Sequence, residues 1–466
     1  MLSRFSIFPL FLFAFTLFPS PKPVVADTPP SRFICPSELE TGIDRILQRE
    51  EFTRSYWGIL IQPLHSNQSL YRRNENKFFI PASNAKLLTT AAALQAFPPD
   101  YRIKTPVLAR GNAPNLETLT VVGKGDPTLT TEKLQTLARQ LKDRGIRQID
   151  RLQVDDSFFP RSNLNKTWEW EDIFFYYAVA PSSLTLNENA VKLEVSPTRV
   201  GQPISLQWSD TLAARQWSIE NRATTAPAGT PNTLEIKGNL GDSRLIITGS
   251  LAIDAKDDFS IAIPDPTRYF LDRWREILQD EGITVKSAGI TPEPVGEEIT
   301  SIESDPISQI VQRVNTESHN FFAETLLQLI GGTEGVKERL TGLGINSDGY
   351  SLQDGSGLSR QNLTTPETLV RALQLFEKNA TYRDSLAIAG VRGTLAGRFQ
   401  NTPIQGRLQG KTGTLSGVVS LSGYLENPNY DSIAFSILVN HSDRPATITR
   451  NGIDEIILLL GRLKRC

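Results

Sequence analysis

A chain of 466 residues is long enough for two or three domains, and its hydrophobic fraction of 39% and charged fraction of 21% indicate a globular protein with an extensive core. This balance excludes a disordered, collagen-like or coiled-coil chain. A formal net charge of -2 argues against an electrostatic nucleic-acid binder. Two cysteines and three histidines make the chain a poor candidate for a zinc or iron–sulfur site, so we expect no metal and no cofactor.

The first residues are predicted to be a secretory signal peptide. Arg4 precedes an almost wholly apolar run, Phe5–Phe18, and small residues around Ala26 form a cleavage pattern. The alternative is an uncleaved membrane anchor, for which a run interrupted by Pro9 is short. We expect residues 1–26 to be removed, leaving an exported protein, periplasmic or cell-wall-facing, without a transmembrane anchor.

Two cysteines lie near the ends of the mature chain, Cys35 and Cys466. In an exported protein they are candidates for a disulfide that joins the termini, because oxidising compartments favour such bonds. Two unpaired thiols are the alternative, and the sequence leaves it open.

The mature chain opens with a predicted helix and a predicted hairpin. Apolar residues recur at helical spacing within Ser37–Glu50, and two short strands are expected at Tyr56–Ile61 and Ser69–Arg73. A second helix is expected to open at Pro81, and it is rich in alanine and leucine, both strong helix formers, as far as Leu94.

From Asp100 to about Ile290 the sequence changes character. Short alternating strands, punctuated by Gly, Asn, Asp and Pro turns, predict a mostly β region of one or two domains. The strands are expected at Leu116–Val122, Ala190–Val195, Ile204–Trp208 and Arg244–Leu251, and the helices at Thr131–Asp143 and Pro266–Asp280.

After Pro306 the helical periodicity returns, with a helix expected over Phe321–Ile330. Two alternating strands, Gly417–Leu425 and Ser432–Val439, precede a last helix from about Ala446.

The order of these elements predicts an α+β protein with a discontinuous domain. We expect this domain to comprise residues 27–99 and 291–466, and the mostly β region, residues 100–290, to be inserted into it.

The first of three short motifs is Ser83-Asn84-Ala85-Lys86, at the start of the second predicted helix. A serine and a lysine three residues apart share one helical face, so the hydroxyl and the amine can form a hydrogen bond. The helix N-terminus adds positive potential where a developing oxyanion would lie. Burial would lower the lysine pKa towards that of a useful base. Taken alone, the motif more often marks a serine N-cap followed by a solvated lysine.

The second motif is Ser318-His319-Asn320, at a predicted helix entry. Here a hydroxyl could relay a proton to a leaving amine, and an amide could hold a substrate carbonyl. Serine and asparagine are also common helix caps, so this motif is weak when taken singly.

The third motif is Lys411-Thr412-Gly413-Thr414, on a late strand. A lysine and two hydroxyls suit a substrate carboxylate, and glycine permits close backbone approach. The alternative is an edge strand protected by a lysine. The three motifs in this order, on helix, helix entry and strand, form the penicilloyl-serine-transferase signature.

On these residues the chain resembles the penicillin-binding D-alanyl-D-alanine carboxypeptidase/endopeptidase family, low-molecular-weight class C. The 235-residue separation of Ser83 and Ser318 matches the place where that family carries two inserted domains. Further similar segments are Gly123–Leu129, where Lys124 departs from the family's glycine, Trp168–Asn189 and Asp354–Arg360. The resemblance implies a transpeptidase/β-lactamase-like fold, an antiparallel sheet flanked by helices, interrupted by that insertion.

The resemblance also implies roles for the motif residues. Ser83 would attack the bond between two D-alanines, Lys86 would take its proton, and Ser318 with Lys411 would protonate the leaving D-alanine. Asn320 would hold the acyl-side carbonyl. The remaining implied positions bind substrate: Thr412, Gly413 and Thr414 at the terminal carboxylate, and Asp172 and Tyr177 near the stem-peptide side chain. Peptidoglycan stem peptides ending in D-Ala-D-Ala would be the substrates, and β-lactams would acylate Ser83.

Three other functions share part of this pattern. A serine β-lactamase uses the same motifs, but the long insertion argues against it. An esterase of the same fold need not keep Thr412 and Thr414, and a non-enzymatic wall-binding scaffold would tolerate loss of Ser83 or Lys86; all four residues are present. Carboxypeptidase and endopeptidase activities use one site and differ in the shape of the cleft, so the motifs do not separate them.

Overall fold

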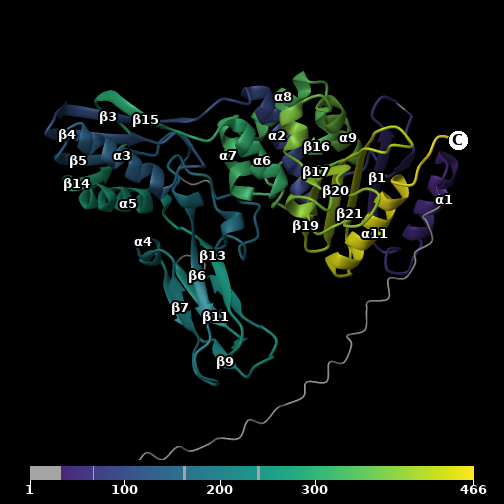
Figure 1. The fold of residues 1–466 in the computed structure, drawn as a ribbon, viewed down its shortest axis with the longest axis horizontal. Helices are drawn as coiled ribbons and strands as arrows, with labels where there is room; N and C mark the ends of the chain where they lie inside the picture. The colour runs from purple at the N-terminus through teal and green to yellow at the C-terminus, as the bar shows by residue number, and fades with distance from the viewer. Residues whose placement is uncertain (1–32, 67, 161–163, 239–241) are drawn as a thin grey trace, which may run out of the picture.

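Strands from early and late parts of the chain form one six-stranded antiparallel sheet in the computed structural model, which describes residues 33–66, 68–160, 164–238 and 242–466 (Figure 1). The strand order is β18 (Ala387–Ile388), β19 (Leu408–Leu415), β20 (Val418–Leu425), β21 (Ile433–Asn440), β1 (Tyr56–Pro63) and β2 (Tyr71–Arg73). The predicted hairpin, β1 with β2, and the predicted late strands, β20 and β21, are confirmed. The predicted signal peptide lies outside the described residues.

Helices cover both faces of this sheet, because its strands direct alternate apolar side chains into two separate cores. On β1, Ile59 and Ile61 pack in one core with α1 (Pro36–Leu47) and α11 (Ala446–Leu460), whereas Leu60 packs in the other. The second core contains residues of α2 (Ala85–Ala96), α6 (Ile307–Thr316), α7 (Asn320–Leu329), α8 (Gly332–Gly342), α9 (Pro366–Leu375) and α10 (Ala380–Asp384). A short ladder of β16 (Tyr350–Ser351) and β17 (Leu363–Thr364) lies beside them.

Between α2 and α6 the chain forms separate sheets, which extend away from the central one (Figure 1). The first has the order β14 (Thr284–Ile290), β5 (Gln148–Asp155), β4 (Asn115–Val122), β3 (Lys104–Asn112) and β15 (Glu297–Glu303), and its core includes residues of α3 (Thr131–Asp143) and α5 (Pro266–Asp280). Both helices match the predicted ranges. Strand β15 follows residue 290, where the inserted region was expected to end, and it pairs with β3 of the same sheet. The polar sequence of β15 shows no alternation that would reveal a strand.

Smaller sheets form the lower arm of Figure 1. They are β13 (Asp257–Ala262), β6 (Ala190–Ser196) and β7 (Ser205–Trp208); β10 (Glu235–Gly238), β11 (Arg244–Thr248) and β8 (Ser218–Asn221); and β12 (Ser250–Ala252) with β9 (Thr224–Ala226). The single strand expected over Arg244–Leu251 is therefore two. Gly249 divides it, because its φ of +93° lies in the left-handed region and a Cβ there would lie 2.0 Å from the Thr233 carbonyl oxygen.

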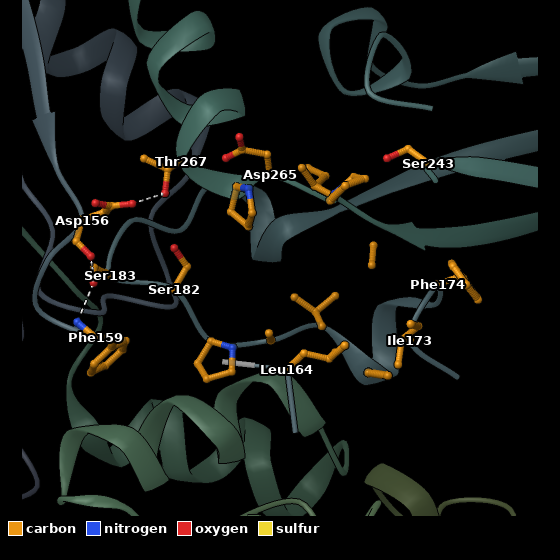
Figure 2. A pocket seen from close by; sticks show the side chains of 18 of the residues that line it. Asp156, Phe159, Leu164, Ile173, Phe174, Ser182, Ser183, Ser243, Asp265 and Thr267 are labelled. Atoms are coloured by element: carbon orange, nitrogen blue, oxygen red, sulfur yellow. Dashed lines mark hydrogen bonds between the residues drawn. The ribbon is translucent and has the colours of Figure 1, made fainter. Parts of the chain in front are cut away.

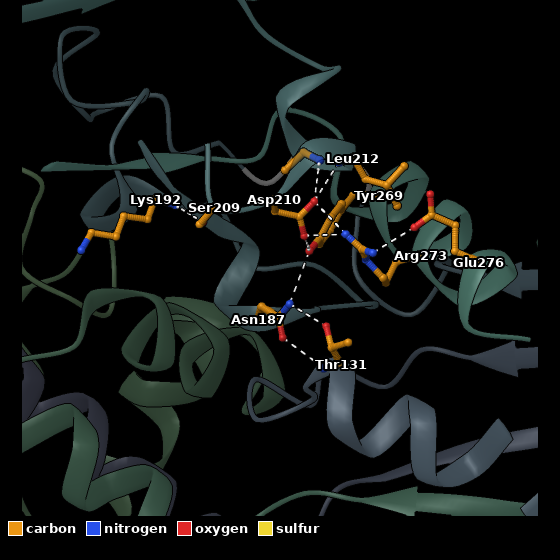
Figure 3. A network of polar contacts seen from close by, with 10 residues as sticks. Thr131, Asn187, Lys192, Ser209, Asp210, Leu212, Tyr269, Arg273 and Glu276 are labelled. Carbon is orange, nitrogen blue, oxygen red and sulfur yellow. Dashed lines mark hydrogen bonds and ion pairs between the residues drawn. The ribbon is translucent and has the colours of Figure 1, made fainter. Parts of the chain in front are cut away.

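A polar network joins these two groups of inserted strands (Figure 3). Arg273 of α5 donates hydrogen bonds of 2.8 and 2.7 Å to the carboxylate of Asp210, which follows β7, and Tyr269 Oη donates to the same carboxylate over 2.7 Å. Asn187 Nδ2 donates to Tyr269 Oη over 3.3 Å and to Thr131 Oγ1, at the start of α3, over 2.9 Å. The network therefore fixes the arm against the five-stranded sheet.

The two ends of the described chain are covalently joined. Cys35 and Cys466 form a disulfide, with their Cα atoms 5.8 Å apart. Ile34 pairs with Leu463 as a parallel bridge beside it. None of the helices in the described ranges has the length and hydropathy needed to span a bilayer.

Candidate active site

Ser83 and Lys86 meet at the start of α2. Ser83 lies in a short 3-10 turn, Ala82–Asn84, and Lys86 is one helical turn further on, with its Nζ 3.0 Å from Ser83 Oγ. Ala82 has a φ of +48°, in the left-handed region, which costs free energy for a residue with a Cβ. The turn is held against β20, because Asn84 Nδ2 donates to Ser420 Oγ over 2.6 Å and Ser420 donates to the Pro81 carbonyl over 2.8 Å.

The surroundings of Lys86 favour a neutral amine. Its side chain is fully buried, and this loss of solvation lowers its pKa from 10.5 to about 7, against the opposing charges of Asp354 and Glu324. Besides Ser83, Lys86 Nζ donates to Asn320 Oδ1 over 2.7 Å and to the Ser356 carbonyl over 2.6 Å. A neutral amine has two hydrogens for these two oxygens and one lone pair, which is then free to accept the Ser83 proton.

Ser318 lies between α6 and α7, and Asn320 is the first residue of α7. Ser318 has a φ of +63°, a second strained position, and its Oγ accepts a 2.9 Å hydrogen bond from Lys411 Nζ. Lys411 is fully buried, and both burial and the charge of Lys86 hold its pKa well below the ordinary value. The second and third motifs, 93 residues apart, therefore meet at one hydrogen bond.

The Lys411-Thr412-Gly413-Thr414 motif lies on β19, and Gly413 lets this strand approach Ser83. A Cβ on Gly413 would lie 2.9 Å from the Ser83 backbone nitrogen and 3.0 Å from Ala82 Cβ. A cavity of about 430 Å³ opens beside the strand, and Thr412 Oγ1 donates to Thr394 Oγ1 there over 2.8 Å. Its lining consists of Thr394, Gly397, Arg398, Thr412, Gly413, Thr414, Val419, Ser420 and Arg450.

Of the two residues predicted in the inserted region, Tyr177 contacts the site through Asn320, and Asp172 contacts Tyr177. Tyr177 Oη donates to Asp172 Oδ1 over 2.9 Å, and burial together with this carboxylate raises the pKa of Tyr177. The Tyr177 backbone carbonyl accepts a 2.7 Å hydrogen bond from Asn320 Nδ2. The inserted region thus orients the Asn320 amide, whose oxygen faces Lys86.

The loop after β16, Asp354–Arg360, resembles a segment of the family, but the motifs predict none of its residues at the site. Asp354 is fully buried and accepts hydrogen bonds from its own loop, from Gly357 N over 2.7 Å and Ser359 N over 2.6 Å, and from the inserted Trp168 Nε1 over 2.8 Å. This loop carries the Ser356 carbonyl that binds Lys86.

Glu324 of α7 lies beneath the same loop. Its carboxylate accepts from Gly355 N over 3.1 Å and from Ser356 N over 2.7 Å, and burial raises its pKa. No sequence motif pointed to this residue.

A larger cavity, of about 810 Å³, lies in the inserted region (Figure 2). Its polar wall is internally bonded: Thr267 Oγ1 donates to Asp156 over 3.0 Å, and Ser183 Oγ donates to the Asp156 carbonyl over 2.7 Å. None of the predicted site residues is among the described residues that line it. In the described ranges, no group of His, Cys, Asp and Glu side chains has the arrangement of a metal site.

Comparisons with known proteins agree with this geometry. A family model described as the D-Ala-D-Ala carboxypeptidase 3 (S13) family matches residues 39–460. A D-alanyl-D-alanine carboxypeptidase of Actinomadura sp. (strain R39) is 33% identical over 463 residues, covering 92% of this chain and 85% of that protein.

Two solved structures share the fold. Penicillin binding protein 4 of Haemophilus influenzae has a TM-score of 0.78 at 25% identity, covering 90% of this chain and 98% of its own. A predatory peptidoglycan endopeptidase of Bdellovibrio bacteriovorus has a TM-score of 0.53 at 17% identity, over 86% of this chain and 92% of its own. The α+β fold class predicted from the order of the elements is confirmed.

Proposed function

The chain belongs to the D-Ala-D-Ala carboxypeptidase 3 (S13) family and is a serine-type D-Ala-D-Ala carboxypeptidase, and from this premise we propose that Ser83 is its nucleophile and Lys86 its general base. One observation carries the assignment: a fully buried amine, with its pKa lowered to about 7, lies 3.0 Å from a serine hydroxyl at a helix start. A base with a pKa near the working pH is efficient in proton transfer.

In the acylation step, Ser83 Oγ bonds to the carbonyl carbon between the two D-alanines while its proton moves to Lys86 Nζ. The backbone N–H groups of Ser83 and Thr414 stabilise the negative oxygen, a role that the close approach at Gly413 supports. The C–N bond then breaks, and the leaving amine takes a proton from the Ser318 hydroxyl, which Lys411 replenishes across their 2.9 Å hydrogen bond. D-Alanine leaves, and water hydrolyses the acyl-enzyme, its hydroxyl going to the acyl carbon and its remaining proton to Ser83 Oγ. Exchange with solvent then removes the proton that Lys86 took up and restores the one that Lys411 gave.

Substrate binding follows from the groups around this centre. Asn320 holds the acyl-side carbonyl, and Thr412 and Thr414 bind the terminal carboxylate in the cavity beside β19. Asp172 and Tyr177 approach the stem-peptide side chain. The substrates are peptidoglycan stem peptides ending in D-Ala-D-Ala, and β-lactams, which mimic that end, acylate Ser83.

The catalytic domain in this proposal is discontinuous. Residues 27–99 and those after β15 form it, and the accessory region from β3 to β15 is inserted, since strands β3–β15 pair among themselves. Export to the periplasm or the cell wall is supported by the N-terminal sequence pattern and by the disulfide, which oxidising compartments favour.

The test is covalent labelling of the mature protein by a fluorescent penicillin, followed by intact mass, beside Ser83→Ala. We expect one stable adduct on the wild-type protein and none on the variant. Rapid turnover of the adduct would favour a β-lactamase. Folded wild-type protein that forms no adduct would contradict the acyl-serine mechanism.

A further inference from the structure

The cavity beside β19 contains two arginines in its lining, and they differ in their partners. The Arg398 guanidinium forms an ion pair with Asp454 of α11, so its charge is compensated. Arg450 lies one helical turn before Asp454 on α11 and is half-buried, yet its guanidinium forms no hydrogen bond or ion pair with any described residue. Burial raises the pKa of the Asp454 carboxyl, and the charges of Arg398 and, least, of Arg450 oppose this rise; only Arg398 forms a direct contact with the carboxylate.

The charge balance of the cavity is therefore positive. None of the described residues that line it is acidic, and its polar groups are the hydroxyls of Thr394, Thr412, Thr414 and Ser420. One uncompensated guanidinium beside hydroxyl groups suits a planar anion, because arginine can donate two parallel hydrogen bonds to a carboxylate. The position of Arg450 in the first half of α11 gives no compensating benefit from the helix dipole, which favours cations at the other end.

We propose that Arg450 is a substrate-binding residue that selects peptides with a free C-terminal carboxylate, which its guanidinium binds beside Thr412 and Thr414. This inference rests on the proposed function, because the carboxylate reaches the cavity only when the scissile bond lies at Ser83. Arg450 lies on the last helix, outside the three motifs, so a fourth segment of the chain binds the substrate in this proposal.

The test compares a peptide ending in D-Ala-D-Ala with the same peptide carrying a C-terminal amide. The measured quantity is the ratio of kcat/KM for the acid to kcat/KM for the amide, which is independent of the fraction of folded enzyme. We expect Arg450→Ala to lower this ratio by about 10- to 100-fold, by slowing hydrolysis of the acid alone, since a charge-assisted hydrogen bond is lost. Arg450→Lys keeps the positive charge but lacks the two parallel N–H donors of the guanidinium, so it should recover part of the lost ratio.

Arg444→Ala is the matched control. It removes one positive charge from the segment before α11, where Arg444 is exposed, pairs with Asp443 and does not line the cavity. We expect Arg444→Ala to have the same acid-to-amide ratio of kcat/KM as the wild-type protein. If Arg450→Ala keeps the wild-type ratio, or slows both peptides equally, Arg450 is structural and the inference is wrong. If the wild-type protein hydrolyses neither peptide, the proposed function itself is contradicted; an active wild type with an unchanged ratio contradicts only the role of Arg450.

Discussion

At the scale of single residues, the protonation state of Lys86 sets when the enzyme can act. Only the neutral amine accepts the Ser83 proton, and burial lowers the Lys86 pKa to about 7. Below this pH the amine is protonated, so the acylation rate constant should fall about tenfold per pH unit, and above it the rate should level off. The measurement is penicillin acylation between about pH 5 and pH 9, with circular dichroism to monitor folding. A rate that stays level down to the acid end, on folded protein, would rule out Lys86 as the base.

The residues of this site divide into those the sequence revealed and those it did not. The Ser83 to Lys86 spacing predicts a shared helical face, and the two atoms are in contact. The Ser356 carbonyl is a backbone group, so the residue type at this position does not predict its contact with Lys86. Trp168 and Asp354 are 186 residues apart, and their hydrogen bond depends on how the inserted region docks. Local periodicity carries no information about such docking.

At the scale of elements, the close approach of β19 to α2 depends on Gly413. In Gly413→Ala the new methyl group would overlap the Ser83 backbone nitrogen and Ser420 Oγ, so the strand must move away. We expect acylation to slow by about 10²-fold, because the backbone donors of the oxyanion site lose their geometry, with a loss of thermal stability of only a few degrees. The measurement is the acylation rate constant together with the melting temperature.

Gly410→Ala provides the comparison for this variant. Gly410 lies on the same strand, and a Cβ there would approach Ser422 O at 3.2 Å and Leu421 at 3.3 Å, away from Ser83. It tests general strain in β19 without displacing the strand from α2. Equal rate losses in the two variants would mean that strand strain, and not the approach to Ser83, accounts for the effect.

Elements with strong periodicity were predictable, and those defined by pairing partners were not. The helix expected at Thr131–Asp143 is α3, because its leucines recur on one buried face. The strand β15 was missed because its two apolar residues, Ile299 and Ile302, are three positions apart and do not alternate with the polar ones, and its pairing with β3 defines it as a strand. The split at Gly249 follows from the backbone of Thr233, which no window of sequence around Gly249 contains.

At the scale of the whole molecule, the disulfide closes the chain from Cys35 to Cys466 into a ring. It spans 431 residues, and α1 and α11, next to the two cysteines, pack in one core. Cross-linking so distant residues restricts the unfolded chain, so replacing both cysteines by serine should lower the free energy of unfolding by about 2–5 kcal/mol. Because the bond lies outside the active site, kcat/KM at room temperature should stay unchanged. Denaturant unfolding and peptide hydrolysis measure the two quantities.

Chemical reduction of the disulfide is an independent control for the predicted loss of stability. A reductant should lower the denaturation midpoint of the wild-type protein to that of the Cys35→Ser/Cys466→Ser variant and should leave the variant unaffected. If the variant is as stable as the oxidised protein, helix packing between α1 and α11 alone holds the ends together. If kcat/KM of the folded variant falls instead, the disulfide also maintains the geometry of the active site at α2. Because Arg450 lies on α11, that second result should appear with the acid peptide and not with the amide.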